Sequence, residues 1–303
     1  MNAPITLSCK TSTDLLSIPV VMLGFHPRES LVVMVVADGR VQMCARADLF
    51  WFVSDFEETV RSISNGVHRF QDPDVALVAY CSNVNDGGLS VGEMLDVLGG
   101  HVRQMLVTDG DRYWDMVRGD MPWDPGHRWA WDQTALAASA VYNGLPVASC
   151  REDVVTDVAE PAIDQRLATH MQQAARDVAA SSDVLSDLEW LMESDAALEV
   201  EEACRLAVLL QHEECAVEVM SLLSQERAGR YRARLTEARR TVAGPASATV
   251  VGLLGLACWL DGQGAMAADC LQLVLQLDPM NLPGSMLEFV QCNALPPSWW
   301  DEK

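Results

Sequence analysis

The sequence lacks the short motifs that identify the commonest enzyme classes. It contains no Gly-x-Gly-x-x-Gly, no phosphate-binding Gly-x-x-x-x-Gly-Lys-Ser, no His-Glu-x-x-His and no Gly-x-Ser-x-Gly. The segment His212-Glu213-Glu214-Cys215 lacks the second histidine that a zinc site on a helix requires. We therefore predict neither a metal nor a cofactor, and whether the chain is an enzyme stays open.

Positive charge is also scarce. The 303 residues carry a formal net charge of −22, which repels phosphate backbones and anionic lipid headgroups. Nucleic acid and membranes are therefore poor candidates as partners. The one basic segment, residues 227–240, includes Arg230 and Arg234 and could bind an acidic partner or nucleic acid. Neutralisation by neighbouring Glu-rich helices is the preferred alternative.

Paired cysteines and an export signal are missing as well. The nine cysteines are scattered without a Cys-x-x-Cys, as is typical of small buried side chains in a reducing compartment. The first residues show no basic region followed by an apolar core, so we predict a soluble, cytoplasmic protein. Residues 241–260 are uncharged and long enough to span a bilayer, but their proline and glycines favour a buried helix.

The N-terminal half alternates strand and helix signals, and the chain is long enough for two domains. The predicted strands are residues 5–9, 31–37, 41–46, 75–81 and 103–107, with turns at Asp38-Gly39 and Asp109-Gly110. The predicted helices are residues 15–23, capped at 11–14 and distorted or restarted by Pro19, then 53–66, with a capping box at 54–57, and 89–98. These patterns predict an α/β (or α+β) domain with a mixed sheet over residues 1–150.

Helical periodicity dominates the second half, which we predict to be an all-helical domain over residues 151–303, packed on or against the first. The predicted helices are residues 135–142, 161–180, 184–193, 200–211, 216–240, 249–260, 265–277 and 284–292. Near its end, the spacing of small and apolar residues matches one tetratricopeptide-like helical hairpin. The matching residues are Leu254, Gly255, Gly262, Ala267, Leu271 and Pro279.

A loop at residues 24–30 combines side chains capable of chemistry between a helix and a strand. His26 could act as a general base while Arg28 holds an anion, with Ser30 beside them; a structured turn explains the same residues. Arg46 and Asp48 project from one face of a strand, where an ion pair with a buried or interdomain partner is the preferred interpretation.

Four tryptophans crowd the segment that follows the last strand. Trp114, Trp123, Trp129 and Trp131 could form an exposed interaction surface. The alternative is that their rings tie a proline-rich loop to the body of the domain.

Several motifs together resemble a family known only as domain of unknown function 4192, from actinobacteria. The motifs are Asp14-Leu15-Leu16 with Pro19, Leu23-Gly24-Phe25-His26-Pro27, Ser30-Leu31-Val32-Val33, Arg46 with Asp48-Leu49, Ser149 with Arg151-Glu152, Ala257 with Trp259-Leu260, Gly262 with Gly264-Ala265, Asp278-Pro279 and Pro296-Pro297. Phe50-Trp51 stands where the family usually has a proline. The resemblance implies no activity and no catalytic residue.

Two hypotheses of function follow. The first is a non-enzymatic protein-interaction or regulatory protein, whose partner is another protein; a homo-oligomer is compatible with the sequence. The alternative is an enzyme or small-molecule binder using residues 24–30 with Arg46 and Asp48. Convergence of His26, Arg28, Arg46 and Asp48 on one pocket would favour the alternative.

Overall fold

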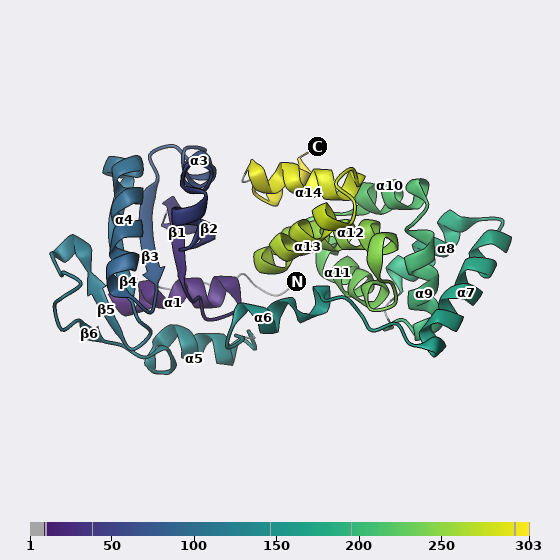
Figure 1. Ribbon diagram of the computed structural model, residues 1–303, viewed down its shortest axis with the longest axis horizontal. Helices are drawn as coiled ribbons and strands as arrows, with labels where there is room; N and C mark the ends of the chain where they lie inside the picture. Colours follow the sequence, from purple (N-terminus) through teal and green to yellow (C-terminus); the bar gives the residue numbers. More distant parts are fainter. Residues whose placement is uncertain are drawn as a thin grey trace. The chain divides into compact units, whose positions relative to one another are not determined.

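The chain divides into two compact units, Met1–Asp153 and Val154–Lys303 (Figure 1). The computed structural model describes residues 9, 11–37, 39–145, 147–194, 196–293 and 295–302. Residues 5–8 of the first predicted strand, and Asp38 of the first predicted turn, lie outside these residues.

The first unit is built on a mixed sheet, as predicted. Its strands lie in the order β2-β1-β3-β4-β5-β6, and only the β3–β4 pair is parallel. The bounds are β1 Ser30–Ala37, β2 Arg40–Asp48, β3 Asp74–Tyr80, β4 Val102–Thr108, β5 Arg112–Asp115 and β6 His127–Arg128. The short strands β5 and β6 are absent from the sequence prediction, because four and two residues are too few to show alternation.

Helices cover both faces of this sheet, which makes the unit three layers deep (Figure 1). On one face Leu31 and Val33 pack with α2, α3 and α4. On the other face Val32 and Met34 pack with α1 and α5. The bounds are α1 Ser12–Leu23, α2 Trp51–Ser54, α3 Phe56–Val67, α4 Val84–Leu98, α5 Ala135–Tyr142 and α6 Arg151–Val154. Central strands β1 and β3 are therefore buried on both sides, as their continuous apolar sequences indicate.

Helix α1 begins as predicted but does not restart at its proline. Thr11 and Asp14 form a capping box, and Gly24 ends the helix with a φ of 76°. The predicted restart at Pro19 is wrong, since α1 runs through it to Leu23. One lost backbone hydrogen bond is tolerated there because Leu16 and Ile18 are buried in the apolar cluster against the sheet.

The helix predicted at residues 53–66 is two helices, α2 and α3, and the predicted capping box is wrong. Asp55 precedes α3, but its side chain makes no capping hydrogen bond to the helix. Instead the Ser54 hydroxyl donates to the Asp55 carboxylate over 2.9 Å. Ser54, the cap of the predicted box, is the last residue of α2.

The second unit consists of helices and the loops that join them, with no strand among its described residues. Its helices are α7 Gln165–Ala180, α8 Val184–Glu193, α9 Val200–Leu209, α10 Glu213–Leu222, α11 Gln225–Arg239, α12 Ala248–Leu260, α13 Gly264–Leu277, α14 Leu282–Cys292 and α15 Ser298–Asp301. The single helix predicted at 216–240 is wrong. Its apolar periodicity runs on, but Ser224 accepts a hydrogen bond from the Arg227 N–H and starts a new helix.

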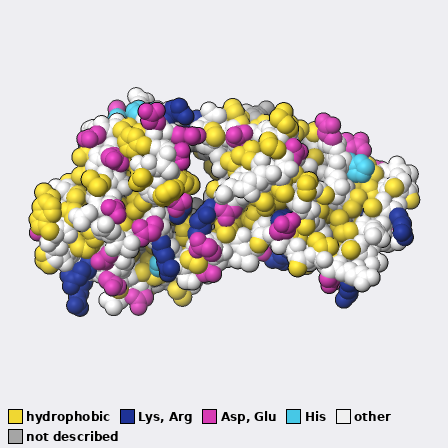
Figure 2. Space-filling model, viewed as in Figure 1, with side chains coloured by type: hydrophobic (Ala, Val, Ile, Leu, Met, Phe, Trp, Pro, Cys, Tyr) yellow, Lys and Arg dark blue, Asp and Glu magenta, His cyan; other side chains and the backbone are white. Residues whose placement is uncertain are grey.

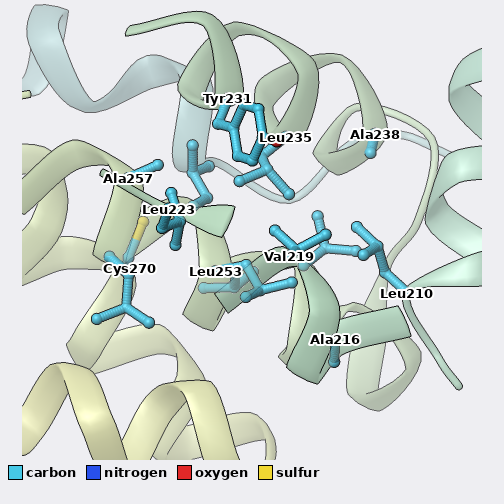
Figure 3. Close-up of a cluster of buried hydrophobic side chains, with 14 of the residues drawn as sticks. Leu210, Ala216, Val219, Leu223, Tyr231, Leu235, Ala238, Leu253, Ala257 and Cys270 are labelled. Atoms are coloured by element: carbon cyan, nitrogen blue, oxygen red, sulfur yellow. The ribbon is translucent and has the colours of Figure 1, made fainter. Parts of the chain in front are cut away.

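Helix α12 forms the centre of this unit. Its side chains Leu253 and Ala257 lie among Val219, Leu223 and Leu235 from the surrounding helices (Figure 3). It occupies most of the uncharged segment considered above as a membrane span, but it has 13 residues. Among the described helices, none combines the length and the apolar character that crossing a bilayer requires.

Two glycines of α4 give a matched test of helix-to-sheet packing. A Cβ at Gly87 would lie 2.5 Å from the Cys81 Sγ and 2.9 Å from Val107 Cγ1, whereas a Cβ at Gly92 meets no atom within 4 Å. We expect Gly92→Ala to raise the melting temperature, because alanine favours a helix over glycine by about 1 kcal/mol. Gly87→Ala should lower it by several degrees, because overpacking outweighs that gain. Equal melting temperatures of the two variants would contradict the close approach.

Candidate functional site

The first unit contains a pocket of about 580 Å³ at the edge of the sheet where the parallel strands β3 and β4 end. Carboxyl ends of neighbouring parallel strands are a common place for sites in α/β proteins. The lining residues come from the α1–β1 loop, the ends of β3 and β4, the β4–β5 turn and the segment near β6. They are His26, Pro27, Arg28, Glu29, Tyr80, Cys81, Ser82, Thr108, Asp109, Gly110, Asp111, Trp129, Trp131 and Ser149.

The α1–β1 loop is held at this edge by its backbone. The N–H of His26 donates to the Ala148 carbonyl, and the Ala148 N–H donates to the Gly24 carbonyl. Glu29 has a φ of 43°, a left-handed conformation that costs a non-glycine residue energy. Its carboxylate accepts the Ser82 N–H over 2.8 Å, which fixes the loop to the end of β3.

The imidazole of His26 lies against Trp131. Their ring centroids are 5.6 Å apart in an edge-to-face arrangement. Partial burial, and then the charge of Arg28, lower the pKa of His26 below its ordinary value. The ring is therefore neutral at pH 7, with one nitrogen that donates and one that accepts. Its nitrogens have no hydrogen-bond partner among the described residues.

Arg28 presents its side chain to solvent at the mouth of the pocket. Its carbonyl accepts a hydrogen bond from the buried Ser30 hydroxyl over 2.5 Å. Within the described part of the chain, the guanidinium forms neither an ion pair nor a hydrogen bond. Five N–H donors beside a neutral imidazole can therefore bind an incoming group.

The opposite wall is fixed by the hydroxyl of Thr108. This oxygen accepts hydrogen bonds from the Trp129 Nε1–H and the Gly110 N–H, at 2.8 and 3.0 Å, and donates to the Arg112 carbonyl. The backbone N–H of Trp129 also donates to the Asp111 carbonyl. The β4–β5 turn and the indole of Trp129 are thus one rigid assembly.

The acidic and thiol groups of the pocket differ in availability. The Asp109 carboxylate accepts the N–H groups of Asp111 and Arg112, at 2.9 and 2.7 Å. The Asp111 carboxylate is exposed and engages none of the described side chains. Burial and nearby carboxylates raise the pKa of Cys81 to about 12, so this thiol is protonated and not a nucleophile. No three His, Cys, Asp or Glu side chains in the described ranges lie together as a metal site.

The predicted site residues therefore separate into two groups. His26 and Arg28 line the pocket, while Ser30 is buried beneath the loop. Arg46 and Asp48 lie outside it and pair with each other at 2.5 Å, whereas the preferred interpretation of the sequence gives them a buried or interdomain partner. Cross-strand register gives their position: Asp48 lies opposite Ser30 on β1, and Ser30 lies opposite Tyr80 on β3, so strand β1 separates Asp48 from the end of β3.

The four tryptophans do not form one exposed surface. Trp114 is buried, and its Nε1–H donates to the Asp124 carbonyl. Trp129 and Trp131 are half-buried and line the pocket. Trp123 alone of the four is largely exposed, at 79%. Three of the rings thus tie the loop to the sheet, and the predicted surface reduces to Trp123.

The basic segment is largely neutralised inside the helical unit. Arg230 pairs with Glu193 at 2.5 Å, and Arg234 pairs with Glu237 at 2.6 Å. Arg234 is only 5% exposed, so it is not part of a surface. Figure 2 shows acidic side chains spread over the visible face, with Lys and Arg at separate places.

Several pocket residues are missing from the sequence prediction. Ser82, Thr108, Asp109 and Asp111 directly follow two strands that were predicted. Loops that follow neighbouring parallel strands lie at the same edge of a sheet. A prediction that β3 and β4 are parallel would therefore have placed these residues together. Ser149 carries no such signal, because its place depends on the pairing of residue 148 with Phe25.

Comparisons with known proteins define the family but give no activity. Neither the curated proteins nor the solved structures yielded a significant match. One family model matches residues 13–298, nearly the whole chain, and its description is domain of unknown function (DUF4192). The match spans both units and includes every lining residue of the pocket. The chain therefore belongs to the DUF4192 family.

Proposed function

We propose that the first unit binds a small molecule in the pocket at the ends of β3 and β4. The observation that carries this proposal is that His26 and Arg28 line the pocket with their side-chain nitrogens unengaged by described residues. These nitrogens reach solvent, so a ligand can replace water on them without breaking a contact within the protein. The volume of about 580 Å³ is within the usual range for small-molecule sites.

Two further features support a binding site over an incidental hollow. The strained backbone of Glu29 is held in place by hydrogen bonds from Ser82 and Leu49. Strain of this kind is concentrated at functional sites. The Thr108 assembly also fixes Trp129 in advance, which lowers the entropic cost of binding.

The proposal is limited to binding because the candidate nucleophiles are engaged. The hydroxyl of Thr108 has three hydrogen-bond partners, and the Cys81 thiol is protonated. The Ser149 hydroxyl donates to Asp153 over 2.6 Å. This is the small-molecule form of the alternative hypothesis, using His26 and Arg28 without Arg46 and Asp48.

A fragment screen followed by fluorine NMR tests the proposal. In the full chain labelled with 5-fluorotryptophan, we expect bound fragments to shift the Trp129 and Trp131 resonances. The Trp123 resonance, from an exposed ring outside the pocket, should not move. Arg28→Ala should weaken such binding about fivefold or more without changing the melting temperature. A screen in which no fragment shifts Trp129 or Trp131 would contradict the proposal.

Binding of another protein by the helical unit is a second candidate function. It is supported by the packing of α12 against α13, whose residues Gly255 and Ala267 fit one tetratricopeptide-like hairpin. A cytoplasmic location suits both candidates and is supported by buried free thiols such as Cys204 and Cys258. Capture of one stoichiometric partner, followed by binding of that purified partner to the full chain, would test it.

A further inference from the structure

The charges around the pocket restrict the ligand, if the pocket is the binding site proposed above. Three carboxylates line it, from Glu29, Asp109 and Asp111, against the one guanidinium of Arg28. Burial lowers the pKa of His26, so its ring adds no positive charge at pH 7. Tyr80 is neutral too, because burial raises the pKa of its hydroxyl. The lining thus has net negative charge.

The three carboxylates disfavour an anionic ligand. A phosphate or carboxylate would gain from Arg28 but would be repelled by those carboxylates. A cation would be attracted overall, because three carboxylates outweigh one guanidinium, so the choice between a cationic and a neutral ligand depends on the hydrogen-bonding groups. A neutral ligand incurs no repulsion from any of these charges.

The available hydrogen-bonding groups match hydroxyls. Asp111 can only accept, Arg28 can only donate, and the neutral His26 can do both. A hydroxyl group donates and accepts, so neighbouring hydroxyls on one ring can satisfy all three. The indoles of Trp129 and Trp131 supply flat apolar surface for the face of that ring.

We propose that the ligand is a neutral ring bearing several hydroxyl groups, packed against Trp129 and Trp131 and hydrogen-bonded to Asp111, Arg28 and His26. This chemistry has two sources, a free saccharide and the ribose of a nucleoside. The inference rests on the proposed small-molecule function and specifies its ligand class.

The test compares neutral probes with their phosphorylated counterparts. Isothermal titration of the full chain would use a panel of methyl pyranosides and nucleosides, each beside its monophosphate. We expect at least one neutral probe to bind, and its monophosphate to bind about tenfold more weakly. Binding of pyranosides alone indicates a saccharide ligand, and binding of nucleosides alone indicates a nucleoside.

Variants connect the binding to the pocket. Trp131→Ala should weaken the neutral probe about tenfold or more, while Trp123→Ala leaves it unchanged. Asp111→Asn should reduce the discrimination against the monophosphate. Trp131 packs on His26, so its replacement also disturbs the position of the imidazole. Arg28 is exposed, and Arg28→Ala is therefore the second variant, which should weaken binding of the neutral probe about fivefold.

The outcomes separate this inference from the proposed function. A monophosphate that binds more tightly than its neutral counterpart, and loses that advantage in Arg28→Ala, overturns the ligand class but keeps the pocket. A second outcome also overturns the ligand class but keeps the pocket. In it, fragments shift the Trp129 and Trp131 resonances while no neutral probe binds at 10 mM, a concentration on the order of the weakest specific affinities. If neither fragments nor probes bind, both proposals fail.

Discussion

Arg239→Ala is expected to lower the free energy of unfolding of the helical unit by about 3 kcal/mol. The Arg239 side chain is among the largest that are fully buried, at 1% exposure. Its Nε–H donates to the Val158 carbonyl over 3.1 Å, and its Nη1–H donates to the Val242 carbonyl over 2.6 Å. Truncation leaves both buried carbonyls unpaired and creates a cavity. Burying a charged guanidinium is itself unfavourable, and burial lowers the pKa of Arg239. Its removal therefore recovers part of this cost.

The neighbouring residue supplies the control. Arg240 pairs with Asp157, but 62% of its side chain is exposed. Surface ion pairs of this kind contribute about 0–1 kcal/mol, so Arg240→Ala should have little effect. Hydrogen–deuterium exchange resolved by peptide would compare α11 and α12 in both variants, which keeps the measurement within the helical unit. Similar exchange in the two variants would contradict the structural role of Arg239.

Arg239→Met separates the polar contribution from the volume. Methionine restores much of the apolar bulk but cannot donate to the Val158 and Val242 carbonyls. We expect its exchange rates to lie between those of Arg239→Ala and the native chain. If Arg239→Met matched the native chain, the two carbonyl hydrogen bonds would contribute nothing net.

The regular elements were predictable from local patterns. Strand β3 reads as a short continuous apolar segment between polar turns, and helices α5 and α8 have the predicted bounds. These features depend on residues close in the sequence, where periodicity and capping are decisive. The break between α10 and α11 shows the limit, because the apolar periodicity of the two helices is continuous across Ser224.

The pocket was only half predictable, for a different reason. His26 and Arg28 could be singled out because a loop between helix and strand concentrates polar side chains. Whether they meet Trp131 or Asp48 depends on which strands pair and in which direction. Arg46 and Asp48 lie on the edge strand β2, and β1 lies between them and the parallel pair β3–β4. Sheet order is a long-range property that the residues of one strand do not determine.

Gly255→Ala is the second substitution with a large expected effect. An added Cβ would lie 2.8 Å from the Cβ of Cys270 on α13 and would overlap the Leu287 Cδ2 on α14. The Cys270 Cβ is attached to its backbone, so relief requires α13 itself to shift. We expect a loss of about 2–3 kcal/mol in unfolding free energy, after the gain in helix propensity of about 1 kcal/mol.

A control and a double variant identify the cause of that loss. Gly264→Ala introduces the same methyl group at the start of α13, where no atom lies within 4 Å, and should be neutral or slightly stabilising. Leu287 is fully buried, so Leu287→Ala alone should cost about 2–5 kcal/mol by leaving a cavity. In the double variant the alanine at position 255 occupies part of that cavity, so the combined loss should be smaller than the sum of the single losses. The double-mutant cycle would be measured by hydrogen exchange of α12 peptides. Strictly additive losses would show that residues 255 and 287 do not share the contact. The close approach of α12, α13 and α14 at Gly255 would then have to be abandoned.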